Sequence, residues 1–261
     1  MQEALSLTRL IAGMSTRRLH ALYGEDASRA LDWVRATALD GWAPAQVCYG
    51  RMLLAGTGVA RDETAALAWF RRAALQGDPE AVNMLGRCLD EGWGIAADPA
   101  AAADCYRRAA ASGHVWAAYN LGHLYLDGRG VVRDPDRAFA CYRRAAGQGH
   151  ARAMNLLARC HEEGWGTPPD FAAAAHWFRR SAAGGCFRGR YNWATILLRF
   201  GRIEAAVEQF AAAARSGSAG VRRAVRMLGA APDAPAALAG LAARLQAEEG
   251  PDAPANSRGF N

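Results

Sequence analysis

Residues 117–149 read AAYNLGHLYLDGRGVVRDPDRAFACYRRAAGQG, and residues 81–113 read AVNMLGRCLDEGWGIAADPAAAADCYRRAAASG, the same pattern 36 residues earlier. A fixed period of about 20 to 50 residues is typical of repeat proteins, in which each unit buries its apolar face against its neighbours. The pattern therefore predicts a solenoid. Each unit opens with a glycine in the same register: Gly41, Gly77, Gly113, Gly149 and Gly185.

Each repeat is predicted to be a pair of helices. Apolar residues recur at helical spacing in two segments, as Leu85 and Leu89 do in the first and Tyr106 and Ala109 in the second. Between the segments, a Gly-x-Gly is predicted to end the first helix, because glycine adopts the left-handed C-cap conformation without a Cβ penalty. An aspartate then offers its carboxylate to the amide groups that begin the second helix. These signals recur at Gly56/Gly58, Gly92/Gly94, Gly128/Gly130 and Gly164/Gly166, and at Asp62, Asp98, Asp134 and Asp170.

Two columns of the register predict how the helices pack. Small residues in the first helix allow helix axes to approach to about 8 to 10 Å. Large aromatic residues in the second helix are expected to fill the core between hairpins rather than to bind a cofactor. The small column holds Gly50, Gly86, Gly122 and Ala158, and the aromatic column holds Phe70, Tyr106, Tyr142 and Phe178.

The register also divides the chain into segments. Asp26–Asp40 aligns with Asp62–Gln76 at the same offset of 36 residues, so the N-terminal region is predicted to be a degenerate repeat. Terminal repeats are expected to deviate, because one of their faces meets water. We expect N-terminal capping helices over 1–40, full repeats over 41–76, 77–112, 113–148 and 149–184, a shortened repeat over 185–216, C-terminal capping helices over 217–249 and a disordered tail over 250–261.

These units resemble Sel1-like repeats, a branch of the tetratricopeptide-type solenoids. The resemblance is close in residues 117–149 and covers about residues 26–216, and the short fifth unit is more similar to a plain tetratricopeptide repeat. The resemblance implies an all-α, right-handed α/α superhelical solenoid of antiparallel helix pairs, with about five repeats plus capping helices. It also implies a non-catalytic adaptor or scaffold that binds a partner protein or an extended peptide segment, for which we expect a role in bacterial signalling or complex assembly.

Composition leaves the partner open. All 31 basic residues are Arg, against 25 Asp and Glu, for a net charge of +6. The absence of Lys is typical of a GC-rich coding bias, so nucleic-acid binding is only an alternative. No apolar run reaches the roughly 18 to 20 residues of a membrane span, and no secretory signal is evident. We expect a cytoplasmic monomer or weak oligomer, although the amphipathic stretch Leu7–Leu22 leaves a targeting signal open.

No catalytic constellation stands out in the sequence. It contains no G-x-S-x-G, Walker loop or H-E-x-x-H motif, so we expect no enzyme activity, no metal and no cofactor. His114 and His150 follow the glycine that opens a unit and are predicted to be surface loop residues. Residues 160–163 (CHEE) combine ligand types, but adjacent helix residues point about 100° apart and cannot converge on one ion.

The six cysteines are predicted to be free, buried thiols. Some cysteine-rich, secreted Sel1-like proteins carry disulfides in fixed columns and are associated with β-lactam binding, so a β-lactam-type hydrolase is the alternative for an enzyme. Here only the pairs Cys88/Cys160 and Cys105/Cys141 share columns. Cys88 and Cys105 fall on the two helices of one hairpin, and whether they pair stays open.

The predicted binding site lies on the first helices, which line the concave face in such solenoids. Arginine forks there would pair with carboxylates, and asparagine amides would bond a peptide backbone. We expect a basic, amide-rich groove for an extended or acidic peptide segment. Its residues are Arg51, Arg87, His123 and Arg159 in one column and Asn83, Tyr119, Asn120, Asn155, Tyr191 and Asn192 in two others.

A second candidate site is the pair of loop residues Trp93 and Trp165. Thr57 and Arg129 hold the same column in other units, so packing does not require Trp there. The two side chains are therefore predicted to be partner-binding loop anchors, with folding onto a neighbouring helix as the alternative.

Paired arginines mark the second helices. Because basic residues near helix C-termini favour the helix dipole, we interpret them as a solvated outer stripe, and contact with a nucleic-acid backbone is the alternative. The pairs are Arg71/Arg72, Arg107/Arg108, Arg143/Arg144 and Arg179/Arg180.

Overall fold

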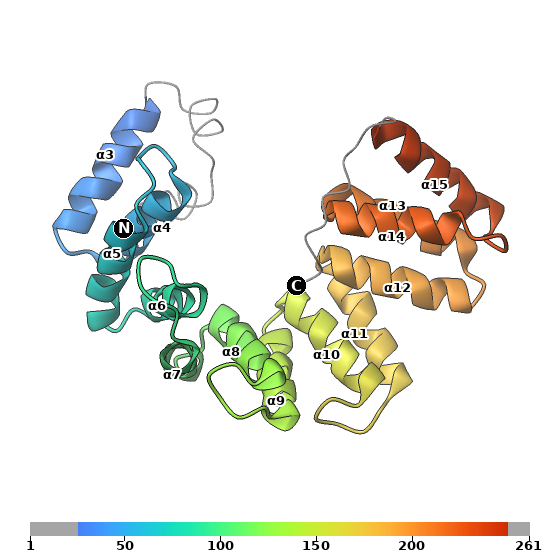
Figure 1. Cartoon of the computed structure of the whole chain (residues 1–261), viewed down its shortest axis with the longest axis horizontal. Helices are drawn as coiled ribbons and strands as arrows, with labels where there is room; N and C mark the ends of the chain where they lie inside the picture. Colours follow the sequence, from blue (N-terminus) through green and yellow to red (C-terminus); the bar gives the residue numbers. More distant parts are fainter. Residues whose placement is uncertain (1–25, 250–261) are drawn as a thin grey trace. The chain divides into compact units, whose positions relative to one another are not determined.

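A computed structural model describes residues 26–249 of the chain, with side chains from residue 31 to residue 248. Within this range the backbone forms thirteen helices and no strand (Figure 1). The predicted all-α solenoid of antiparallel helix pairs is confirmed. Residues 1–25 of the capping segment expected over 1–40, and the tail expected over 250–261, lie outside the described residues.

The helices alternate along the chain as first and second members of hairpins. The first helices are α4 (Ala43–Ala55), α6 (Pro79–Glu91), α8 (Val115–Asp127), α10 (Ala151–Glu163) and α12 (Phe187–Arg199). The second helices are α5 (Glu63–Leu75), α7 (Pro99–Ala111), α9 (Pro135–Gly147), α11 (Phe171–Ala183) and α13 (Ile203–Ser216). Before them lies α3 (Asp26–Leu39), and after them lie α14 (Ala219–Gly229) and α15 (Ala236–Glu249).

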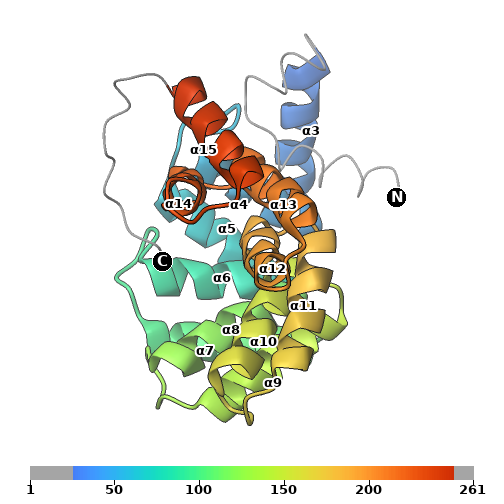
Figure 2. The same cartoon turned by 90° about the vertical axis from the view of Figure 1, so that its right-hand side faces the viewer.

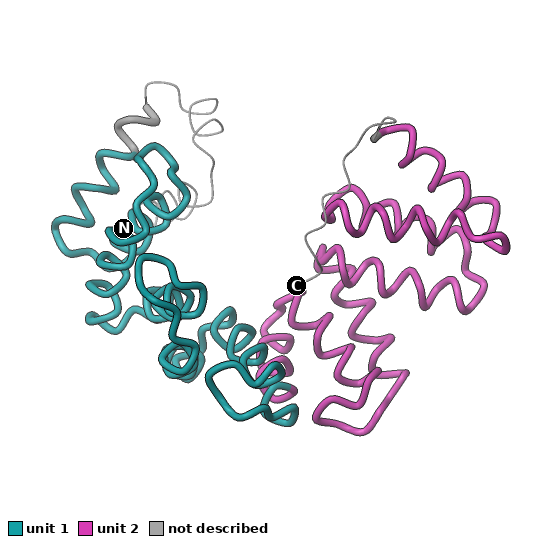
Figure 3. The backbone as a smooth tube through the Cα atoms, in the orientation of Figure 1, with its two compact units in different colours: residues 1–138 teal, residues 139–261 magenta. Residues whose placement is uncertain are grey.

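The chain divides into two compact units, residues 1–138 and 139–261, which Figure 3 shows in different colours. In unit 1, α4 packs on α5 and α6 packs on α7, and in unit 2, α10 packs on α11 and α12 packs on α13. Figure 2 shows the end of unit 2, where α14 and α15 pair with each other and pack against α13. Phe210, Val225 and Leu238 are the buried centre of that end.

The helix boundaries form as the register predicts. Gly92 closes α6 in the left-handed region, at φ 77°, and its amide donates to the carbonyl of Cys88. Asp98 opens α7, because its Oδ1 accepts the amide of Ala101 at 3.0 Å. The same C-cap recurs at Gly56, Gly128 and Gly164, and the same N-cap recurs at Asp62, Asp134 and Asp170.

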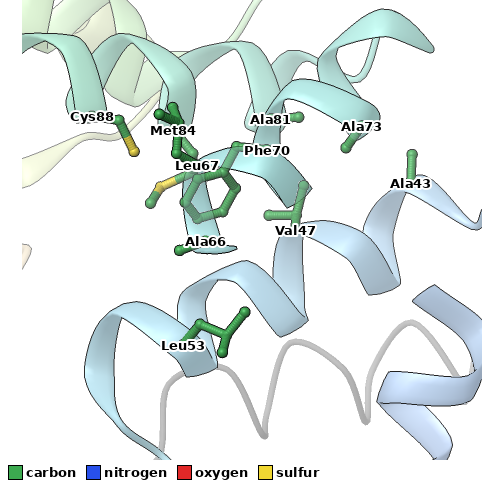
Figure 4. Close-up of a cluster of buried hydrophobic side chains, with 10 residues drawn as sticks. All are labelled: Ala43, Val47, Leu53, Ala66, Leu67, Phe70, Ala73, Ala81, Met84 and Cys88. Carbon is green, nitrogen blue, oxygen red and sulfur yellow. The ribbon is translucent and has the colours of Figure 1, made fainter. Parts of the chain in front are cut away.

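The small and aromatic columns meet in the core of the hairpin of α4 with α5 and of the hairpin of α6 with α7. Phe70 is fully buried in the cluster that Figure 4 shows, between residues of α4, α5 and α6. A Cβ on Gly50 would lie 2.6 Å from Phe70 Cε1, and one on Gly86 would lie 2.8 Å from Tyr106 Cδ1. The prediction that aromatic residues fill the core is confirmed: Phe70, Tyr106, Tyr142 and Phe178 are at most 1% exposed.

The second glycine of two Gly-x-Gly turns, at Gly94 and Gly130, has a role that the sequence did not suggest. A Cβ on Gly94 would lie 2.5 Å from the carbonyl oxygen of Glu63, at the start of the preceding second helix. Gly130 approaches the backbone of Pro99 and Ala100 in the same way. The loop glycine therefore allows one repeat to lie directly against the helix start of the repeat before it.

Replacement of Gly50 by Ala should destabilise the protein by about 1 to 3 kcal/mol, because the Phe70 ring is buried and cannot move aside. Gly147→Ala is the matched control, since Gly147 lies in α9 with no atom within 4 Å of an added Cβ. It should stabilise the protein by up to about 1 kcal/mol. Urea unfolding followed by circular dichroism measures both, and equal midpoints for the two variants would contradict the packing described here.

Candidate functional site

The candidate site residues fall into two similar groups, one in each unit. Surface 1 is formed by α6 and α8 and the loop after α6, with Asn83, Arg87, Trp93, Tyr119, Asn120 and His123; Arg51 on α4 adjoins it. Surface 2 is formed by α10 and α12 and the loop after α10, with Asn155, Arg159, Trp165, Tyr191 and Asn192.

An asparagine pair joins the two first helices of each surface. Asn120 Nδ2 donates to Asn83 Oδ1 at 3.2 Å, and Asn192 Nδ2 donates to Asn155 Oδ1 at 2.9 Å. Asn83 and Asn155 are only 3% and 4% exposed. Their carbonyl groups therefore serve helix packing, and the amides within reach of a bound segment are those of the half-buried Asn120 and Asn192.

The predicted groove arginines and loop tryptophans come together. Arg87 Cζ lies 4.8 Å from the centre of the Trp93 ring, and Arg159 Cζ lies 4.7 Å from that of Trp165. The loop turns each tryptophan back onto its own helix, where the Trp93 amide donates to the Cys88 carbonyl at 2.9 Å. Both indole rings are half-buried, and Trp93 packs against the hydrophobic core. Each surface thus presents an arginine guanidinium group stacked on a tryptophan indole ring.

The arginines differ in their acidic partners. Arg51 forms an ion pair with Glu80, and Arg159 lies 3.6 Å from Glu163, one turn along α10. In the described part of the chain, no carboxylate lies within ion-pairing distance of Arg87, which contacts Met84 Sδ at 3.8 Å. Stacking on Trp93 is therefore what orients the Arg87 guanidinium.

The tyrosines of the two surfaces are placed differently. The Tyr119 ring lies edge-on to His123, at 4.7 Å between ring centres, and to Trp116, at 5.9 Å. These three rings form a ladder along α8, and Trp116 is 44% exposed. Tyr191 instead packs edge-on against the buried Phe210, and burial raises the pKa of its hydroxyl.

Comparison with known proteins assigns the fold to a family. Four successive matches to the model of the Sel1 repeat cover residues 43–78, 79–114, 117–150 and 151–186. The chain belongs to the Sel1 repeat family. Sel1 repeat proteins generally mediate protein–protein interactions. A comparison with curated proteins found no match.

Solved structures of Sel1 repeat proteins resemble the chain over most of its length. A Sel1 repeat protein from Oxalobacter formigenes is 30% identical, with a TM-score of 0.66 over 72% of this chain and 76% of that one. The antigen c5321 of uropathogenic Escherichia coli is 27% identical, with a TM-score of 0.68 over 90% of this chain. This chain spans about half of c5321, 52% of its length. Immunity protein Pa5087 from Pseudomonas aeruginosa, 18% identical with a TM-score of 0.52 over 78% of this chain and 79% of that one, shares the fold.

Two histidines of the Sel1 repeats act as helix caps. The Nδ1 atoms of His114 and His150 accept the amides of Ala117 and Ala153, each at 3.1 Å. Both lie in the turn before a helix, as predicted, but their side chains are half-buried, so the prediction that they lie on the surface is wrong. A sequence signal existed, because Asp78, a good N-cap residue, holds the same place in its repeat and accepts the amide of Ala81.

His114 also links the start of α8 to α6 through Glu80, a residue that the sequence analysis missed. Because His114 Nδ1 accepts the cap hydrogen bond, its Nε2 carries the proton and donates to Glu80 Oε2 at 2.8 Å. Burial alone would raise the pKa of Glu80, but this hydrogen bond and the charge of Arg51 together lower it. The Glu80 carboxylate thus accepts one hydrogen bond from Arg51 and one from His114.

The six cysteines are free thiols, and Cys88 and Cys105 are not joined. Burial raises the pKa of Cys88 and of Cys160 to about 11, so neither presents a thiolate near neutral pH. Among residues 26–249, no three His, Cys, Asp or Glu side chains are grouped so that they could hold a metal ion. No helix in that range is long and apolar enough to cross a membrane.

The paired arginines of the second helices are all exposed, in agreement with a solvated stripe. Some of them cover aromatic rings of their own helix. Arg72 Cζ lies 4.8 Å from the centre of the Trp69 ring, and Arg180 Cζ lies 4.9 Å from that of Trp177.

The His150 cap should make stability depend on pH. Burial, aided by the charge of Arg152, lowers the pKa of His150 to about 4, against 6.5 for a free histidine. The unfolded chain therefore binds a proton between these values that the folded chain does not, so stability is full above about pH 6.5 and falls as the pH falls toward 4.

Urea unfolding at about pH 7 and pH 5 should show wild type losing about 1 kcal/mol more than His150→Asp, after allowance for solvent screening. The aspartate keeps the cap, as Asp78 does in its own repeat, and titrates below this range. An equal loss in both proteins would show that His150 is not the group responsible.

Proposed function

We propose that this chain is a non-catalytic scaffold that binds segments of partner proteins on surfaces 1 and 2, in bacterial signalling or complex assembly in the cytoplasm. One observation carries the proposal: an arginine stacked on an indole occurs at equivalent positions of both units, at 4.8 and 4.7 Å. The general role of Sel1 repeats in protein interaction supports it.

The stacked arginine suits recognition for a physical reason. An arginine loses side-chain entropy when it binds, and a head already held on an indole has less to lose. Its five donors form a planar fork that matches a carboxylate or a run of backbone carbonyl groups. The amides of Asn120 and Asn192 lie on the neighbouring helix of each surface and add hydrogen bonds to an extended backbone.

The β-lactam alternative loses its basis in this chain. The cysteine-rich relatives that suggested it carry disulfides, whereas all six cysteines here are free. Nucleic-acid binding gains no specific support, because arginines of the second helices cover aromatic rings of the chain itself.

Capture of partner proteins from lysate of the organism that encodes the chain tests the proposal, with the full chain as bait. Arg87→Ala/Arg159→Ala should retain the partner at least about ten-fold less well than wild type, because it removes both stacked heads. Arg51 is left intact, since its loss would leave the half-buried Glu80 without its ion pair.

The matched control is Arg71→Ala/Arg179→Ala, which removes one exposed arginine from a second helix of each unit. It should retain the partner as wild type does, and all three baits should show the same helicity. Equal retention by all three, or an equal loss in the control, would contradict the proposed site.

A further inference from the structure

Surfaces 1 and 2 are two versions of one site. Asn83 and Asn155, Arg87 and Arg159, Trp93 and Trp165, Tyr119 and Tyr191, and Asn120 and Asn192 are each separated by 72 residues, which is two repeats. The asparagine pair and the stacked arginine have the same geometry in both units. Each surface is complete within its own unit, so the two can be compared position by position.

The positions around this shared centre differ in charge. Surface 1 has Glu80, Trp116 and Asp127 at three of them. The residues of surface 2 at the same places of the register are Arg152, Arg188 and Arg199, all exposed.

The same difference in charge is found when all residues of the helices are counted. On surface 1, α6 and α8 carry four carboxylates and one arginine, and Arg51 and Arg129 pair with two of the carboxylates, Glu80 and Asp90. On surface 2, α10 and α12 carry five arginines against two carboxylates, Glu162 and Glu163, and Glu163 pairs with Arg159. Surface 2 is therefore strongly basic and surface 1 is not.

The arginines of surface 2 flank the asparagine pair along both helices. Arg152 and Arg159 lie one turn before and one turn after Asn155, while Arg188 and Arg199 lie one turn before and two turns after Asn192. At 1.5 Å per residue, these arginines extend over about 10 to 16 Å of helix. An extended peptide covers that length with about three to five residues.

We propose that surface 2 binds a short acidic segment of a partner protein and that surface 1 does not, so that the two units take different partner segments. This inference rests on the proposed function and gives it a ligand class. Charge complementarity favours an Asp- or Glu-rich segment on surface 2, where bidentate arginine pairs fix its position. The uncovered carboxylate of Asp127 and the exposed ring of Trp116 make surface 1 unsuited to such a segment.

A protein segment fits surface 2 better than a single-stranded nucleic acid does. Nucleic acids use exposed aromatic faces on which bases stack. On surface 2, Arg159 covers the Trp165 ring and Tyr191 packs against Phe210. The rings of this surface are thus already engaged by the chain.

Fluorine NMR of the full chain labelled with 5-fluorotryptophan tests the inference, because Trp93 and Trp165 report on surfaces 1 and 2 separately. Their signals are assigned with Trp93→Phe and Trp165→Phe. The probe is the blocked peptide acetyl-Gly-Glu-Asp-Glu-Asp-Gly-amide, and its control is the analogue with Gln and Asn in place of Glu and Asp.

The acidic peptide should shift the Trp165 signal and leave the Trp93 signal in place, and the uncharged analogue should shift neither. Arg152→Gln/Arg188→Gln should weaken the binding at least about ten-fold, because it removes two charges next to the peptide. Arg71→Gln/Arg179→Gln, on exposed second-helix positions, should change it less than about two-fold, since those charges lie on other helices. Circular dichroism verifies that both variants are folded.

Three results would overturn the inference. Equal shifts of the Trp93 and Trp165 signals would show that both surfaces bind the acidic peptide. Equal binding of the uncharged analogue would show that surface 2 does not recognise the charge of the peptide. Tighter binding of a uridine oligonucleotide at Trp165 would assign surface 2 to nucleic acid.

Failure of this inference is distinguishable from failure of the proposed function. If the acidic peptide does not bind while partner capture still depends on Arg87 and Arg159, the proposed scaffold function is supported and the proposed acidic ligand of surface 2 is wrong. If partner capture is indifferent to both arginines, the proposed function itself falls.

Discussion

The contact between a glycine of the first helix and an aromatic ring of the second is the constraint on which the hairpin of α4 with α5 and the hairpin of α6 with α7 depend. Phe70 lies so close to Gly50, and Tyr106 to Gly86, that a single added methyl group would overlap the ring. Because the ring is buried on every other side, it holds the two helices at one distance. The loop glycines extend the same principle between repeats, since Gly94 and Gly130 meet the backbone of the preceding second helix.

This rigid interior leaves the outward positions of the first helices to vary. Side-chain hydrogen bonds also hold neighbouring first helices in a fixed alignment. The asparagine pairs and the bond from His114 to Glu80 do this without using the outermost positions of the helices. Arg87 and Arg159 then stack on loop residues that the Gly-x-Gly turns back toward them. The same backbone can thus present a basic surface in one unit and a mixed, aromatic one in the other.

The fold could be predicted from the sequence because its signals are local and repeat. Glycine C-caps, aspartate N-caps and the aromatic column follow from one residue's conformation or size. Side-chain partners were harder to predict, since they depend on rotamers and on residues one repeat away. The Arg87–Trp93 stack joins two groups that the sequence had presented as separate sites. The caps at His114 and His150 were missed because histidine is an uncommon N-cap, and Glu80 was missed because its partners come from two other helices.

The central claim is that outward charges, and not the shared backbone, decide what each unit binds. Its most direct test is Trp116→Arg/Asp127→Arg, which gives surface 1 the arginines that surface 2 has at Arg188 and Arg199. Both positions are exposed, so the fold should be unchanged. In a titration with the acidic peptide, we expect the Trp93 signal to respond with an affinity within about ten-fold of that at Trp165. A folded variant whose Trp93 signal stays unmoved would contradict the account.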